Sequence, residues 1–171
     1  MANTFTLIES KTLGSSVATI SFTSISSTYT DLCLKLSARA SNAQTYDNFI
    51  ITFNGSSSGY STKLLYGSGT GNGASAGTSS ATVIDYGLIP AATANASVFG
   101  NAEIYIPNYA GSNNKSLSID EVTENNITQA FAALEGALWA NTAAINQITL
   151  TCSTSNFVQY STAYLYGIKN S

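Results

Sequence analysis

Apolar and polar residues alternate along most of this chain. Leu32, Leu34 and Leu36 alternate with Cys33 and Lys35. A period of two is typical of a strand with one face on the core and one face toward water. Residues 18–22 and 49–53 follow the same pattern, and an Asn-Gly pair, a strong turn signal, follows the second of them. Further expected strands are residues 4–9, 60–66, 81–86, 101–106, 115–122, 145–152 and 161–168.

Segments rich in small or turn-forming residues separate the expected strands. Residues 67–80 read GSGTGNGASAGTSS and hold no apolar residue larger than alanine. Such a segment cannot pack a core, so we expect a mobile Gly/Ser loop at 67–80. Residues 91–97, after Pro90, suit a loop or one helical turn, and residues 108–114, after Pro107, suit a loop.

The stretch 127–139 fits two periods. Spacing slightly favours a helix that the Asn125-Asn126 pair could cap, although Gly136 costs a helix about 1 kcal/mol relative to alanine. Ala133, Ala137 and Trp139 equally fit an alternating strand. The positions at helical spacing are Ile127, Ala130, Phe131, Leu134 and Leu138.

These patterns predict a single domain over residues 1–171, with a short extended N-terminal segment at 1–10. Many short strands with no room for crossover helices indicate an antiparallel sheet structure. We expect an all-β, jelly-roll-like sandwich of about 8–10 strands, because the jelly roll is common at this length.

Charge is scarce. Only 9% of the residues are charged, against about 25% in a typical domain, and the chain has no histidine. Without histidine there is no Ser/His/Asp or Cys/His catalytic machinery and no imidazole-ligated metal. Six scattered basic residues are too few to neutralise a nucleic-acid backbone, and no apolar run approaches the ~20 residues that span a membrane. We therefore expect no enzyme activity, catalytic residue, cofactor or metal, and neither nucleic acid nor membrane as a partner.

The two cysteines, Cys33 and Cys152, fall in expected strands far apart in the sequence. A disulfide between them is geometrically conceivable, but nothing in the sequence indicates an oxidising compartment. We expect two free, buried thiols.

Two clusters could carry chemistry, and for both we favour a plainer interpretation. Asp120, Glu121 and Glu124 could bind a hard cation, but adjacent strand residues point to opposite faces, so we favour a solvated strand end. The glycines at 67, 69, 71 and 73 are spaced as in a phosphate loop. No Lys-Ser/Thr pair or helix start follows them, which favours a surface loop.

Aromatic residues could stack on sugars, although such residues more often belong to a core or an interface. Tyr109, between Pro107 and Gly111, is the best candidate for an exposed ring. The other candidates are Trp139 and the remaining nine tyrosines. Low charge combined with many aromatic residues also favours a homo-oligomer.

Several segments resemble one family. They read FTSISSTYTDLCLKLSARA at 22–40, FNG at 53–55, DYGLIPAATANASVFGNAEIYIPNYAGSNNKSLSIDEVTENN at 85–126, LWANTAAINQITLT at 138–151 and NFVQYSTAYLYGIKNS at 156–171. In these segments the chain resembles small structural proteins of marine and freshwater phages, including cyanophages. The resemblance implies a sandwich fold, a strand at 127–139 and no enzymatic activity. Glu135 departs from the expected pattern, because a neutral residue would fit there.

Two virion roles follow from the resemblance. The first is a capsid-decoration (cement) protein, a homotrimer that binds the major capsid protein or other virion proteins on the outer surface after synthesis in the host cytoplasm. The alternative is a tail-fibre or head-fibre tip that binds a host glycan or protein through loops 67–80 and 108–114. No shaft repeat is visible, which favours decoration.

Overall fold

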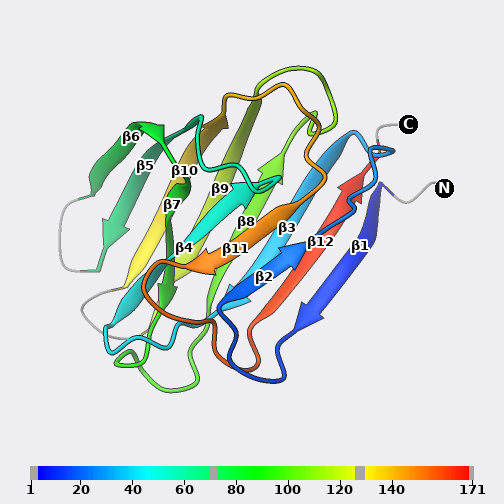
Figure 1. The fold of residues 1–171 in the computed structure, drawn as a ribbon. Helices are drawn as coiled ribbons and strands as arrows, with labels where there is room; N and C mark the ends of the chain where they lie inside the picture. The colour runs from blue at the N-terminus through cyan, green and yellow to red at the C-terminus, as the bar shows by residue number, and fades with distance from the viewer. Residues whose placement is uncertain (1–3, 70–72, 126–129, 170–171) are drawn as a thin grey trace.

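The computed structural model describes residues 4–69, 73–125 and 130–169. These residues form strands, turns and irregular segments, with no helix and therefore no helical membrane span. Figure 1 shows the strands in two facing layers. The strands are β1 (Phe5–Thr12), β2 (Thr19–Phe22), β3 (Asp31–Ala38), β4 (Tyr46–Phe53), β5 (Tyr60–Ser68), β6 (Ala74–Ala81), β7 (Ile84–Pro90), β8 (Gly100–Ile106), β9 (Lys115–Thr123), β10 (Phe131–Trp139), β11 (Ile148–Cys152) and β12 (Thr162–Ile168).

Each layer is one antiparallel sheet. The larger sheet has the order β1-β12-β3-β8-β9-β10-β5-β6, and the smaller has the order β2-β11-β4-β7. The predicted all-β antiparallel sandwich is thus confirmed. The described residues hold twelve strands, more than the 8–10 expected, partly because residues 74–90 form two strands where the sequence pattern indicated one.

The expected mobile loop at 67–80 is wrong for most of its length. β5 continues to Ser68, and Ala74–Ala81 pairs with β5 as β6; residues 70–72 lie outside the described part. β6 is an edge strand held by backbone hydrogen bonds to β5, which need no large side chain. The absence of large apolar residues in this segment is therefore consistent with an exposed strand, and it did not show whether the segment pairs with β5.

The strand prediction at 127–139 is confirmed for residues 131–139, while 127–129 lie outside the described residues. β10 pairs with β9 on one side and β5 on the other. The backbone N–H and C=O groups of β10 can therefore form hydrogen bonds to a strand on each side, whereas a helix would form these bonds within itself. Gly136 faces outward, and a methyl group added there would meet no atom within 4 Å.

The core fills the space between the two sheets. Apolar side chains from both layers form one hydrophobic cluster, in which Phe53, Tyr60 and Trp139 pack together. The Tyr60 and Trp139 rings stack with centroids 6.2 Å apart. Trp139 therefore belongs to the core and is no sugar platform. Cys33 and Cys152 are buried free thiols, as predicted.

Candidate functional site: an apolar groove on the larger sheet

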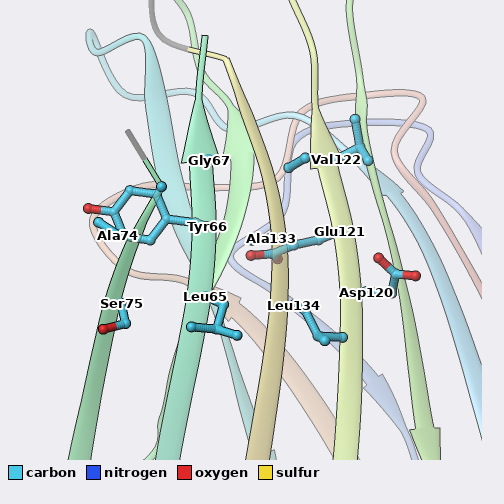
Figure 2. Close-up of a pocket in the computed structure, with 12 residues that line it drawn as sticks. Leu65, Tyr66, Gly67, Ala74, Ser75, Asp120, Glu121, Val122, Ala133 and Leu134 are labelled. Carbon is cyan, nitrogen blue, oxygen red and sulfur yellow. The ribbon is translucent and has the colours of Figure 1, made fainter. Parts of the chain in front are cut away.

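A row of apolar side chains crosses the outer face of the larger sheet. Leu65 on β5 lies directly opposite Leu134 on β10, and Leu134 lies opposite Asp120 on β9. Leu65 is 62% exposed and Leu134 54% exposed, and Val122 on β9 is also exposed. Figure 2 shows Leu65 and Leu134 side by side on β5 and β10, with Val122 farther along the adjacent strand β9. We call Leu65, Leu134 and Val122 the apolar strip.

The alternation of strand residues explains why these side chains face outward. In β5, Leu64 points into the core, so the adjacent Leu65 must point away from it. In β10 the inward positions include Ala133, Ala137 and Trp139, which places Leu134 outside. The side chains of the apolar strip thus face outward because their neighbours in the sequence occupy the core.

Small residues surround the strip and form a shallow groove of about 610 Å³. Gly67, Ala132 and Ala74 are among its lining residues, so the two leucines stand above their neighbours. Asp120 is the exposed charged residue of this lining. An open, nearly uncharged surface of this kind suits contact with another protein better than chemistry on a small substrate.

Beneath the groove, two carboxyl groups lie inside the sandwich. Glu121 extends from β9 toward Ala133 on β10 (Figure 2), and its Oε2 accepts a hydrogen bond of 2.9 Å from the Leu88 backbone N–H. Glu135 on β10 is fully buried, and neither of its carboxyl oxygens has a hydrogen-bond partner among the described residues. Within the described part of the chain, neither carboxyl group forms an ion pair with a basic side chain.

Burial changes the ionisation of both groups. Burial, reinforced by the charges of Glu121 and Asp85, raises the pKa of Glu135 to about 8. Burial also raises the pKa of Glu121 to about 7, although the Leu88 hydrogen bond opposes this and Asp120 adds to it. Glu135 therefore favours its protonated form at neutral pH, and Glu121 keeps its proton to a higher pH than an exposed glutamate does.

The predicted solvated strand end at Asp120, Glu121 and Glu124 is wrong for Glu121, whose side chain is buried inside the sandwich. Asp120 is exposed on the outer face and Glu121 is buried, which confirms that they point to opposite faces. Glu124 lies beyond the strand end and is exposed. Among the described residues, no three His, Cys, Asp or Glu side chains come together to hold a metal ion.

The predicted exposed ring of Tyr109 is wrong. Its side chain is fully buried, and its hydroxyl donates a hydrogen bond to the Ser26 carbonyl. The segment after Pro107 folds back over the core, and the Ile145 backbone N–H donates to the Tyr109 carbonyl. A loop rich in Gly and Asn thus buries its one ring. Gly67 lies in β5, Gly69 in the turn after it and Gly73 directly before β6, with no helix beside them, and Gly71 is outside the described residues.

Neither the apolar strip nor the inward direction of Glu135 was predicted from the sequence. Two signals were present: consecutive leucines at 64–65, one of which must leave the core, and an acid within the apolar run FAALEGALW. Comparison with known proteins adds no guide, because no family model, curated protein or solved structure matches this chain.

Proposed function

We propose that this chain is a non-enzymatic structural protein of a phage virion, a capsid-decoration protein. It would assemble as a homotrimer on the outer surface and stabilise the shell through repeated contacts with the major capsid protein. Three linked copies convert weak single contacts into firm attachment.

The strand order supports a jelly roll, an architecture of viral capsid domains and lectins. In the four-stranded sheet, β2, β11, β4 and β7 stand in the order that a jelly roll gives to its first, eighth, third and sixth strands. Opposite them, β3, β10, β5 and β6 correspond to the second, seventh, fourth and fifth strands. On this interpretation the β8–β9 hairpin is inserted between β3 and β10, and β12 and β1 extend the sheet beyond β3.

The apolar strip is the observation that carries the proposal. Leu65 and Leu134 are large side chains left in water by a protein with a well-filled core. Only 9% of the chain is charged, so few charges would have to be desolvated when such a face is covered. A surface of this kind favours association over solubility as a monomer.

Oligomeric state tests the strip. We expect the wild-type chain to sediment as a trimer at micromolar concentration and Leu134→Glu to shift it toward monomer, because a charge buried at an interface is costly. Thr19→Glu, on an exposed position of β2 in the other sheet, is the matched control and should leave the trimer intact. A monomeric wild-type protein, or equal effects of the two variants, would contradict the proposal.

Copy number tests the location. Quantitative mass spectrometry of purified virions should give hundreds of copies per particle, and particles lacking the protein should form but lose heat or osmotic resistance. A few tens of copies or fewer, together with failed adsorption to host cells, would favour the fibre-tip alternative. Tyr160, 68% exposed in the turn before β12, is the observation that favours this alternative, since an open ring face can stack on a sugar.

A further inference from the structure

A second, smaller pocket lies between the two sheets, where β4 and β7 face β5, β6 and β10. Its volume is about 190 Å³, below the ~300–1,000 Å³ of pockets that take drug-sized ligands. Only a small chemical group would fit. Its principal lining side chains are Tyr46, Asn48, Leu64, Tyr66, Tyr86 and Phe131.

Aromatic rings form the walls of this pocket at steep angles. Phe131 meets Tyr46 with ring centroids 4.9 Å apart and planes at 68°, and meets Tyr66 at 6.0 Å and 59°. The Tyr86 hydroxyl shares a 2.9 Å hydrogen bond with the Thr78 hydroxyl, which fixes a fourth ring. Tyr46 is 36% exposed, so this wall of the pocket is in contact with solvent. Rings set at steep angles present more than one π face to a guest.

Uncompensated acceptors lie directly behind these walls. Glu135 is paired across the sheet with the lining residue Leu64, and Glu121 accepts a hydrogen bond from the lining residue Leu88. Asp85 precedes Tyr86, and one of its carboxyl oxygens is buried without a partner among the described residues. Its backbone carbonyl accepts a 2.6 Å hydrogen bond from the Asn48 side chain. The described residues contribute no basic side chain to the lining.

We propose that this pocket binds an alkylated ammonium group, as carried by choline and related amines. A cation is attracted to the faces of Tyr and Phe rings, and the attraction grows when water is excluded. The carboxyl groups behind the rings add a negative field in a medium of low dielectric constant. A neutral guest of the same shape would gain the apolar contact without either electrostatic contribution. This site is separate from the apolar strip, so the inference does not depend on the virion role.

The acidic surroundings make binding depend on pH. The charged groups that act on Glu135 are Glu121 on β9 and Asp85 on β7, both acidic. The other titratable groups on the packed strands include the phenols of Tyr60 and Tyr66 on β5, Tyr86 on β7 and Tyr46 on β4. Lys63 on β5 and Asp120 on β9 are exposed on the outer face, Asp47 on β4 is buried against Thr154 and Ser155, and the Lys115 ammonium on β9 is held by backbone carbonyls. Because burial raises the pKa of Glu135, ionisation grows between pH 6 and 9, and a bound cation favours the ionised form. We expect affinity to rise over that range and binding to release protons.

The test compares choline with its neutral isostere 3,3-dimethylbutan-1-ol by calorimetry and NMR titration at pH 8.5. We expect choline to bind about tenfold or more tightly than the alcohol, with shifts confined to the pocket. Equal affinities, or no saturable choline binding, would overturn the proposal. Titration with phosphatidylcholine vesicles separates the two sources of the group, because only a lipid headgroup would bring the protein to the vesicle.

Two variants dissect the site. Phe131→Leu removes a wall and should weaken choline binding several-fold. Glu135→Gln keeps the shape of the side chain and should weaken binding and flatten its pH dependence. Tyr164→Leu, which removes a ring from the opposite end of the larger sheet, should leave affinity unchanged. If Glu135→Gln folds and binds choline with the wild-type pH profile, the acidic contribution is refuted.

Discussion

At the scale of single residues, two of the few basic side chains are buried, and each forms hydrogen bonds to backbone carbonyls of loops. The Arg39 guanidinium donates to four backbone carbonyls, including those of Asn95 at 2.7 Å and Val98 at 2.9 Å. Lys115 is fully buried, and its ammonium donates to the Gly111 and Asn113 carbonyls. Lys35, by contrast, is exposed and forms an ion pair with Glu103 on the neighbouring strand β8. Carbonyl oxygens can replace water around a cation, which makes the burial of Arg39 and Lys115 tolerable.

Glu135 gives the residue-scale prediction. Its pKa is raised from 4.5 to about 8 on folding, so its contribution to stability is complete below pH 4.5 and is lost as pH rises toward 8. Chemical denaturation at several pH values should show the wild-type free energy of unfolding falling over this range, on the order of a few kcal/mol. Glu135→Gln should reduce the slope, leaving the smaller contribution of Glu121. An unchanged slope in the variant would contradict the assignment.

At the scale of elements, close contacts between a glycine and an aromatic ring hold strands and loops together. Gly87 on β7 lies opposite Phe49 on β4, and a methyl group added at Gly87 would fall 2.3 Å from that ring. A methyl group added at Gly167 on β12 would likewise fall 2.3 Å from the Tyr29 ring. Neither contact leaves room for a side chain, so these glycines set how closely rings approach the strands.

A matched pair of substitutions tests this packing. Gly87→Ala should lower the free energy of unfolding by about 1–3 kcal/mol, because the Phe49 ring must move within a filled core. Gly136→Ala lies in a strand with open space around it and should raise stability by about 0.5–1 kcal/mol. Thermal and denaturant unfolding measure both. Equal effects would show that ring contact is not what requires glycine at position 87.

At the scale of the whole molecule, one hydrophobic cluster extends through both sheets. Cys33 lies in the larger sheet and Cys152 in the smaller, and burial raises their thiol pKa values to about 11 and about 12. Thiols with such pKa values react slowly in the native state, because the thiolate is the nucleophile. The two thiols therefore report on the opening of each layer.

Thiol labelling tests whether the chain unfolds as a single domain. We expect both thiols to react with a disulfide reagent only on global unfolding, with the same opening free energy, in the single-cysteine variants Cys33→Ser and Cys152→Ser. For each variant, the opening free energy from labelling is compared with the free energy of unfolding of that same variant, measured by chemical denaturation. Different opening free energies, corrected in this way, would show that the two sheets open independently.

The sequence by itself determined where most of the strands lie and which residues of each strand share a face. Alternation within 32–40 and 49–53 is a property of neighbouring residues, and the side-chain period of a strand requires no knowledge of its partners. The opposite directions of Asp120 and Glu121 followed from the same local rule.

Only the tertiary structure decided which strands pair and which face of each is inside. β6 exists because β5 lies beside it, and Tyr109 is buried because its loop folds onto the core. In β10 the sequence left Leu134 and Glu135 equally able to face inward. Trp139 lies in the shared core, and because alternate residues of a strand share a face, Glu135 faces inward with it and Leu134 faces outward. Such choices depend on contacts between residues far apart in the chain, which a local pattern does not contain.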